Sequence, residues 1–328
     1  MPKARLKPLA EQTLLITGAT SGIGLATARE AVRRGAAVFL VARNREALDT
    51  LVAEFRASGA RAGAFEADVA DPVALRAAAD ACQAELGGFD AWINDAGVTV
   101  VGPVREQTLE DQRRLFDTNY WGVVHGSLIA VERLKARPGG GVLINLGSVL
   151  SDMAAPLQAA YSASKHAIKG FTDALRMELL REGAPVQVTL IKPSAIDTPL
   201  NENARNLTDT PIKMPQPVYA APLVAEAILY CCETRVREFT VGGGGKLQTL
   251  LARFAPSLSE PVIARVLPKM YRDPKGARAT EDSLYGPGRD GSERVPYRFV
   301  RKTSLYNKVQ MHPLGALGAA AGAGAVLG

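Results

Sequence analysis

The chain has few of the residues that build metal centres, disulfide frameworks or secretion signals. Three cysteines and three histidines are scattered along 328 residues, and their spacing fits neither a metal site nor a set of disulfides. The adjacent Cys231 and Cys232 are typical of core filling on a helix. The first residues, Met-Pro-Lys-Ala-Arg-Leu-Lys-Pro, lack an apolar signal segment. We therefore expect no metal cofactor and a reducing, cytoplasmic setting.

Aromatic residues and long apolar runs are also scarce. Aromatics make up 6% of the chain, and it contains no helix-turn-helix, zinc or aromatic-basic signature, so we expect no nucleic-acid partner. The uncharged end, 314–328, is shorter than the about 20 apolar residues that a membrane span needs. The segment 269–308 carries ten Lys and Arg against five Asp and Glu. Two interpretations stay open: weak membrane contact through the C-terminal tail, or a free tail.

What the chain does have is apolar sequence in short, regularly spaced segments. Hydrophobic residues make up 47% of it, which is enough for a large core. Short apolar runs predict strands over 13–17, 36–41, 61–66, 89–93, 141–147, 186–191 and 237–241. Helical patterns lie between them, for example over 23–34, 45–57 and 72–86. This alternation predicts an α/β fold, a doubly wound, Rossmann-type parallel sheet of about seven strands with helices on both faces.

A glycine cluster follows the first expected strand. The run Thr17-Gly-Ala-Thr-Ser-Gly-Ile-Gly24 stands between that strand and a helical pattern. Strand, glycine-rich turn and helix is an arrangement that binds the pyrophosphate of a dinucleotide. The glycines permit a tight turn and close backbone approach, and the helix N-terminus offers N–H groups and a positive dipole end. A plain glycine-rich loop is the alternative.

A second motif is Tyr161-Ser-Ala-Ser-Lys165, which follows Ser148 at the end of an apolar run. Two residues four positions apart project from the same face of a helix. An ammonium beside a phenol favours the phenolate, and so draws the tyrosine pKa down from about 10 toward the range useful for proton transfer. Alone the spacing is common, and a half-buried Tyr beside a solvated Lys is the alternative.

Together these motifs resemble the short-chain dehydrogenase/reductase family in its non-extended form, over about residues 12–245. The turn matches the family's T-G-x-x-x-G-x-G, and Asn94-Asp-Ala-Gly97 matches N-N-A-G. Pro193-Ser-Ala-Ile-Asp-Thr-Pro199 matches P-G-x-[VI]-x-T-P. Two residues depart from these patterns. Asp95 replaces the second Asn, where we expect little change in chemistry, and Ser194 replaces a Gly, where we expect a slightly altered nicotinamide pocket.

The resemblance implies an oxidoreductase that interconverts an alcohol and a ketone or aldehyde with a nicotinamide cofactor. Ser148 would hold the substrate oxygen, and Tyr161 would exchange the proton. Lys165 would lower the tyrosine pKa and bind the nicotinamide ribose, and Asn119 would hold a water that links Lys165 to solvent. The positions that correspond to cofactor contacts are Gly18, Thr20, Ser21, Gly22, Ile23, Gly24, Arg43, Asn44, Asp68, Val69, Asn94, Ala96, Gly97, Tyr161, Lys165, Ile196 and Thr198.

Arg43 determines which nicotinamide cofactor is expected. The second strand leads into Ala42-Arg43-Asn44-Arg45, without an Asp or Glu. An acidic residue there binds the ribose 2′-hydroxyl of NAD, whereas an Arg suits the 2′-phosphate of NADP. We therefore expect NADP(H). A solvated Arg43 and use of both cofactors is the alternative.

The substrate is not specified by any motif. Apolar residues after the fourth, fifth and sixth strands suggest an apolar alcohol or ketone, or are ordinary packing; they are Val98, Val100, Val101, Leu150, Met153, Leu157 and Leu200. The segment 195–222 contains five prolines and has the composition of a substrate lid.

The remaining parts frame residues 12–245, the expected catalytic domain. Residues 1–11 form an N-terminal arm, 246–270 a helical extension expected to pack on the enzyme or a partner subunit, and 271–328 a basic, irregular tail with an apolar Ala/Gly end. The resemblance further implies a homodimer or homotetramer through helices near 106–134 and 156–182.

Two other functions fit the same fold. A catalytically silent nucleotide-sensing protein is disfavoured because Tyr161 and Lys165 are both present. A nucleotide-sugar epimerase or dehydratase is disfavoured because the glycines do not follow the G-x-x-G-x-x-G spacing of those relatives.

Overall fold

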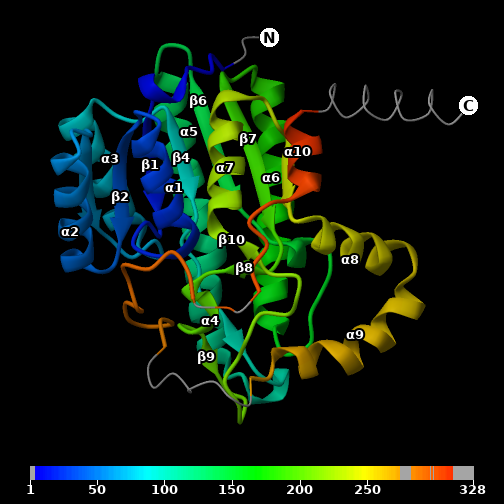
Figure 1. Cartoon of the computed structure of the whole chain (residues 1–328). Helices are drawn as coiled ribbons and strands as arrows, with labels where there is room; N and C mark the ends of the chain where they lie inside the picture. The colour runs from blue at the N-terminus through cyan, green and yellow to red at the C-terminus, as the bar shows by residue number, and fades with distance from the viewer. Residues whose placement is uncertain (1–3, 274–281, 296, 298, 313–328) are drawn as a thin grey trace, which may run out of the picture.

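A computed structural model describes residues 4–273, 282–295, 297 and 299–312. Its centre is a parallel sheet of seven strands in the order β11-β7-β6-β4-β1-β2-β3 (Figure 1). The strands are β1 Thr13–Thr17, β2 Ala37–Ala42, β3 Ala62–Glu66, β4 Ala91–Asn94, β6 Gly141–Leu146, β7 Val186–Pro193 and β11 Glu238–Val241. The predicted doubly wound fold is confirmed, with each strand close to its predicted position.

Helices cover both faces of this sheet, which explains why its central strands are apolar along their whole length. One buried core joins the sheet to α1 Gly22–Arg33, α2 Arg45–Ala57 and α7 Ala221–Glu233. A second core joins it to α3 Pro72–Leu86, α5 Gly122–Ala136 and α6 Ala159–Glu182. The N-caps follow from sequence, since the Asn44 side chain accepts from Ala47 N and Asp71 accepts from Val73 N.

The order of the strands creates a crevice at one edge of the sheet. β1 and β4 are neighbours, but the chain leaves β1 toward the α1 face and leaves β4 toward the α5 face. The connections therefore diverge at the carboxyl ends of these two strands. In doubly wound sheets this switch point is where ligands bind.

Short elements close the crevice. β5 Val100–Val101 pairs with β9 Arg205–Asn206, and β8 Ile196–Asp197 pairs with β10 Tyr219–Ala220. Three 3₁₀ turns and two further helical segments complete this part, namely Val104–Glu106, Val149–Ser151, Pro199–Asn201, α4 Leu109–Phe116 and a π-helix over Asp117–Trp121. A fourth 3₁₀ turn, Leu9–Glu11, directly precedes β1 and bonds to the end of α7. The β5–β9 pair thus ties the predicted lid to the loop after β4, and the β8–β10 pair joins the two ends of the lid.

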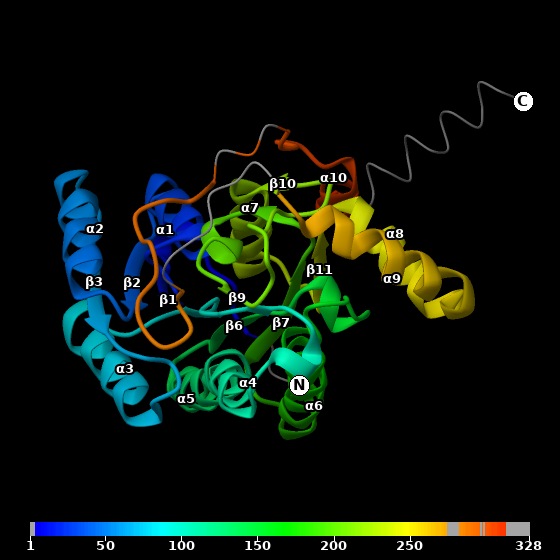
Figure 2. The ribbon, with the colours of Figure 1, turned by 90° about the horizontal axis from the view of Figure 1, so that it is seen from below.

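The C-terminal part is more ordered than its composition suggests. α8 Gly243–Phe254 and α9 Pro256–Tyr271 form a projecting hairpin, and α10 Leu305–Met311 lies beside α7 (Figure 1). Residues 282–295 are irregular and cross the carboxyl edge of the sheet (Figure 2). The helix at 305–311 was not predicted. The Ala/Gly end, 314–328, lies outside the described residues.

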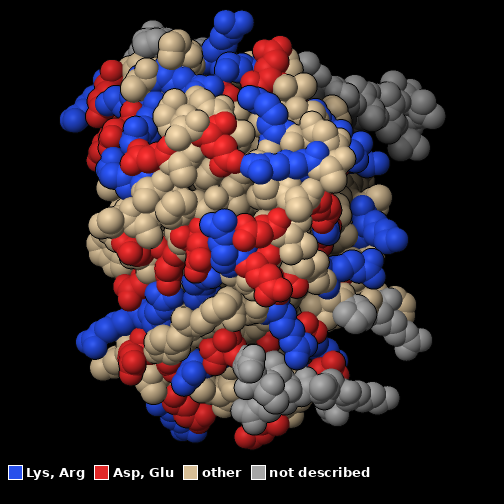
Figure 3. All heavy atoms as spheres, turned by 90° about the vertical axis from the view of Figure 1, so that its left-hand side faces the viewer, with Lys and Arg blue, Asp and Glu red and all other residues tan. Residues whose placement is uncertain are grey.

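The lengths and polarity of the described helices bear on membrane insertion, and the face formed by α2 and α3 shows how charge is distributed on the surface. Within the described ranges, each helix is too short or too polar to cross a bilayer. On the face in Figure 3, Lys and Arg are interspersed with Asp and Glu. The ion pair Arg56–Glu85 joins α2 to α3.

Candidate active site

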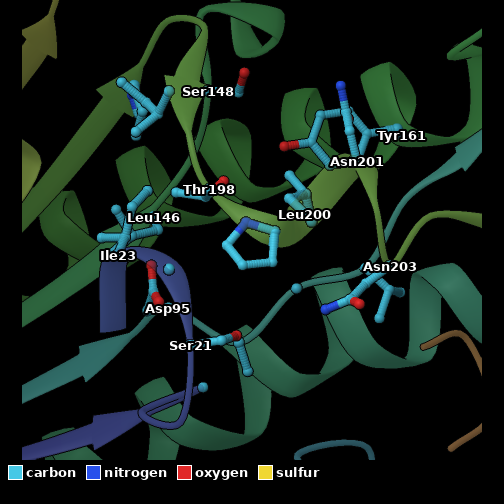
Figure 4. A pocket seen from close by; sticks show the side chains of 18 of the residues that line it. Ser21, Ile23, Asp95, Leu146, Ser148, Tyr161, Thr198, Leu200, Asn201 and Asn203 are labelled. Atoms are coloured by element: carbon cyan, nitrogen blue, oxygen red, sulfur yellow. The ribbon is translucent and has the colours of Figure 1, made fainter. Parts of the chain in front are cut away.

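A cavity of about 260 Å³ lies at the switch point and joins the glycine-rich turn to the Tyr-Lys motif. Figure 4 shows Ser21 and Ile23 on one side of it and Ser148 and Tyr161 on the other. Most of the predicted site residues line it, namely Gly18, Thr20, Ser21, Gly22, Ile23, Arg43, Asn44, Asp68, Val69, Ala96, Gly97, Ser148, Tyr161, Lys165, Ile196 and Thr198. Gly24, Asn94 and Asn119 do not line it.

Gly18 brings two of the motifs into contact. Its φ of +70° is in the left-handed region, and a Cβ there would lie 2.8 Å from the Ala96 Cα. Only glycine combines this conformation with such a close approach. The turn after β1 therefore packs directly on the Asn94–Gly97 loop after β4.

Asn94 stabilises the sheet rather than facing the cavity. Its side chain donates to Asn145 Oδ1 over 2.8 Å and accepts from the Trp92 indole N–H over 2.7 Å. Both partners are fully buried. Asn94 thus joins β4 to β6, and the predicted contact with a cofactor does not follow from its position.

Asn119 lies on the π-helix, a distortion often found at functional sites. Its Oδ1 accepts from Val98 N over 2.8 Å, and its Nδ2 donates to Val98 O over 3.0 Å and to Ser164 Oγ over 3.2 Å. The amide therefore ties the loop after β4 to α6. Because its donors and acceptor are used within the protein, the side chain is a positioning group, and its predicted water-holding role stays untested.

Ser148, Tyr161 and Lys165 meet at the end of β6. Ser148 caps the short 3₁₀ helix Val149–Ser151, and Tyr161 and Lys165 lie one turn apart on α6. The Tyr161 phenol forms a hydrogen bond with the Ser148 side chain. The Lys165 Nζ donates to Leu146 O over 2.9 Å and lies 5.5 Å from the centre of the Tyr161 ring.

The electrostatics of the tyrosine differ from the sequence-based expectation. Burial raises the pKa of Tyr161 to about 12, although the hydrogen bond with Ser148 lowers it. The nearby cation does not bring the Tyr161 pKa down toward neutral pH, because the free-energy cost of a buried phenolate is larger. Tyr161 is therefore protonated throughout the neutral range, as a proton donor must be.

Asp95 has more influence than its position suggests. Its carboxylate is buried against the N–H of Gly24 and near Lys165, and burial raises its pKa to about 7. Burial also lowers the pKa of Lys165 to about 8, while the charge of Asp95 raises it. The charge of Asp95 also raises the Tyr161 pKa. The residue that replaces the family's Asn thus acts electrostatically on both groups.

Replacing Asp95 by Asn is expected to move the pH dependence of any reaction that needs the Tyr161 phenolate. Asparagine keeps an oxygen acceptor for Gly24 N but removes a charge that raises the pKa values of Tyr161 and Lys165. Both pKa values fall, so the rising limb of kcat/KM against pH shifts to lower pH, by about one unit if about 1.4 kcal/mol of interaction is lost. Asp173→Asn, on the outer part of α6, is the control, and an unchanged limb in Asp95→Asn would contradict this electrostatic role.

Several polar atoms at the cavity have no partner within the described part of the chain. They are Arg43 Nη1, Ser194 Oγ, and both side-chain polar atoms of Asn201. Buried polar groups are almost always hydrogen-bonded. These side-chain atoms are donors and acceptors suited to a polar, anionic ligand such as a dinucleotide.

The C-terminal part of the chain supplies walls of the cavity that the sequence did not predict. Leu267 and Tyr271 of α9 and residues of 282–295 line the cavity, and the Tyr271 hydroxyl donates to Gln158 Oε1 over 2.8 Å. The predicted substrate residues Val98, Leu150, Met153 and Leu200 also line it, whereas Val100, Val101 and Leu157 do not. No local sequence signal marks the C-terminal walls, because they arrive from more than 100 residues away.

Comparisons with known proteins agree with this geometry. A family model described as short chain dehydrogenase matches residues 12–208. The uncharacterized oxidoreductase YxnA of Bacillus subtilis is 37% identical over 326 residues, 98% of this chain and 91% of that protein. A 3beta-hydroxysteroid dehydrogenase of Eggerthella lenta is 35% identical over 192 residues, 58% of this chain and 72% of its own.

Solved structures show the same likeness. A gluconate 5-dehydrogenase from Burkholderia cenocepacia, in complex with NADP and tartrate, is 28% identical with a TM-score of 0.63, over 72% of this chain and 96% of its own. A protein from Burkholderia phymatum in complex with NAD has a TM-score of 0.71 over 83% and 99%; at 23% identity it shows the fold alone. Both of these neighbours were solved with a nicotinamide dinucleotide bound.

Proposed function

The chain belongs to the short-chain dehydrogenase/reductase family, and from that premise we propose that it is an NADP(H)-dependent oxidoreductase that interconverts an alcohol and a ketone or aldehyde. The observation that carries the proposal is one cavity lined by Ser148, Tyr161, Lys165 and the glycine-rich turn. A proton donor and the proposed dinucleotide site therefore lie in one cavity, where both can contact the same bound substrate. This is the arrangement that hydride and proton transfer to one carbonyl group require.

Each residue has a definite part in the proposed reaction. A bound nicotinamide supplies or accepts the hydride. The Ser148 hydroxyl holds the substrate oxygen beside Tyr161. Tyr161 gives its proton to that oxygen during reduction and takes it back during oxidation. Lys165, held by the Leu146 carbonyl, keeps a cation beneath the ring and favours negative charge on the phenol as the proton leaves.

We propose an apolar substrate, of lipid, steroid or other ring-containing type. Leu150, Met153 and Leu267 line the cavity and belong to the same apolar cluster as the Tyr161 ring. Relatives named as 3beta-hydroxysteroid and 1-deoxy-11-beta-hydroxypentalenate dehydrogenases point to the same class of alcohol. Gln158 and Tyr271 add the polar pair that would orient a second oxygen of such a molecule.

The test is a panel of ketones and alcohols, apolar and polar, followed by NADPH and NADH absorbance. We expect stoichiometric cofactor turnover with apolar carbonyl compounds. Product formation without net cofactor turnover would instead indicate an epimerase, which recycles its cofactor. Dinucleotide binding with no turnover across the panel would favour the silent nucleotide-sensing alternative.

The proposed preference for NADP(H) depends on Arg43. Its guanidinium lines the cavity just after β2, and its Nη1 has no protein partner within the described residues. Arg43→Asp is expected to lower the NADP/NAD ratio of kcat/KM about ten- to a hundredfold, since a hydrogen bond between charged groups contributes about 1.5–3 kcal/mol. Arg45→Asp, on the exposed side of α2, is the control. An unchanged ratio in Arg43→Asp would remove Arg43 from this role.

We also propose a homodimer or homotetramer formed through α5 and α6. Leu128 on α5 and Met177 and Leu180 on α6 are all more than half exposed, as apolar interface residues are in an isolated subunit. The double variant Leu128→Glu/Leu180→Glu is expected to sediment as a smaller species than the wild type, because it buries two charges at the interface. Val73→Glu, on exposed α3, is the control. Identical sedimentation of the double variant and the wild type would exclude this surface.

A further inference from the structure

Residues 282–295, the C-terminal strap, form part of the wall of the cavity at its dinucleotide end. The strap is fixed along the glycine-rich turn by main-chain hydrogen bonds. Gly291 N donates to Thr20 O over 2.8 Å, and Gly22 N donates to Ser292 O over 2.9 Å. Beside them, Arg29 pairs with Glu293 over 2.9 Å. The strap therefore runs alongside the glycine-rich turn, at the carboxyl edge of the sheet (Figure 2).

One acidic side chain of the strap points into the cavity. Asp290 Oδ1 accepts from Thr20 Oγ1 over 2.5 Å, and its Oδ2 accepts from Asn44 Nδ2 over 2.8 Å. Asp290 lines the same cavity as these partners. Thr20 belongs to the glycine-rich turn and Asn44 follows the end of β2. In this fold, these two places flank the ribose that carries the 2′-hydroxyl or 2′-phosphate.

Arg43 lines the same part of the cavity as Asp290. An anion bound there would be attracted by the Arg43 guanidinium and repelled by the Asp290 carboxylate. The charge of Asp290 acts favourably on the Arg43 guanidinium. A second strap contact holds Arg43 in place, since its Nη2 donates to Ser283 O over 2.7 Å. Arg43 Nη1 remains without a protein partner within the described residues. Arg43 thus has a donor to offer a phosphate, while the carboxylates of Asp68 and Asp290 both lie close enough to act on it electrostatically.

We propose that Asp290 is a specificity-determining residue of the dinucleotide site and weakens the binding of NADP(H) relative to NAD(H). A 2′-phosphate carries a charge of about −1.5 to −2. It cannot share this partly buried place with a carboxylate without strong repulsion, so Asp290 must give way when NADP(H) binds. A ribose 2′-hydroxyl is neutral and donates a hydrogen bond to a carboxylate. The cofactor preference is then a balance between Arg43 and Asp290, and the inference rests on the dinucleotide site of the proposed function.

The test is a set of dissociation constants measured by calorimetry for NADPH and NADH. It includes wild type, Asp290→Asn and, as a matched control on the same strap, Glu293→Gln. We expect Asp290→Asn to bind NADPH about tenfold more tightly or better, a gain of about 1.4 kcal/mol, with NADH affinity little changed. Glu293→Gln removes a strap ion pair outside the cavity and should leave the NADPH/NADH ratio as in wild type. The fragments 2′,5′-ADP and 5′-ADP should reproduce the difference in Asp290→Asn.

Three outcomes would overturn the inference. An unchanged NADPH/NADH ratio in Asp290→Asn would show that the carboxylate does not oppose the phosphate. An equal shift in Glu293→Gln would assign the effect to the stability of the strap. Wild-type protein that binds neither dinucleotide would refute the proposed function as well, whereas the first two outcomes leave that function standing. Asp290→Ser carries the same expectation if the asparagine variant does not fold.

Discussion

Tyr161→Phe is expected to lower kcat by a factor of at least about 100, the lower bound for loss of a positioned proton donor. The substitution removes only the hydroxyl, and the ring keeps its place in the apolar cluster with Leu150 and Met153. One hydrogen bond, to Ser148, is lost, and such a bond contributes about 1 kcal/mol to stability. The protein should therefore fold, and calorimetry should find dinucleotide affinity close to that of wild type.

Tyr271→Phe is the matched control, because it removes a second phenolic hydroxyl from the same cavity. That hydroxyl donates to Gln158 and has no place in the proposed proton transfer. We expect the main change to be a higher KM, with kcat within about tenfold of wild type, since a lost orienting hydrogen bond costs about 0.5–1.5 kcal/mol. If Tyr271→Phe abolished turnover and Tyr161→Phe did not, the assignment of the proton donor would be wrong.

Gly24→Ala is expected to impair both folding and dinucleotide binding. A Cβ at this position would collide with the Gly18 carbonyl oxygen and lie 2.8 Å from the Gly18 carbonyl carbon and 2.9 Å from Asp95 Oδ2. The two Gly18 atoms belong to the backbone and cannot rotate aside, so α1 must move away from the turn. The free energy of unfolding should fall by about 1–3 kcal/mol, and the dissociation constant for the dinucleotide should rise about tenfold or more.

Gly170→Ala on α6 is the control, and it is expected to raise stability where Gly24→Ala lowers it. Gly170 is exposed within the helix, and a Cβ there would meet no atom within 4 Å. Because glycine is a poor helix former, alanine should raise stability by about 0.5–1 kcal/mol. Thermal unfolding measures both variants, and binding calorimetry tests the cofactor site. If Gly24→Ala had the stability and dinucleotide affinity of wild type, the close packing of α1 on the turn would be disproved.

The central fold was predictable because its signals are local. Each strand of the sheet is a short apolar run, and the caps Asn44 and Asp71 stand directly before the helices that they begin. The glycine-rich turn and the Tyr161–Lys165 spacing were equally readable. Both motifs come from segments whose carboxyl-edge placement follows from the parallel sheet itself.

The electrostatics were less predictable, since they depend on burial. Tyr161 and Lys165 were expected to interact by spacing alone, yet burial raises one pKa and lowers the other. Asp95, in place of the Asn, was expected to change the chemistry little, but it is buried and interacts electrostatically with Lys165. Asn94 matched a cofactor motif but bonds to Asn145 within the sheet. A motif gives the residue type, and only the packing gives its surroundings.

By itself, the sequence determined the doubly wound sheet and the glycine-rich turn and proposed which side chains react, because short-range patterns specify strands, helices and caps. Only the tertiary structure decided which distant residues line the cavity at its proposed dinucleotide end. Asp290 lies 246 residues after Asn44 in the chain yet bonds to it, and Tyr271 reaches Gln158 across 113 residues. Such contacts arise when distant segments pack together, and no local periodicity encodes them. The end of β2 contains no acidic residue in the sequence, and the fold supplies one from the C-terminal strap.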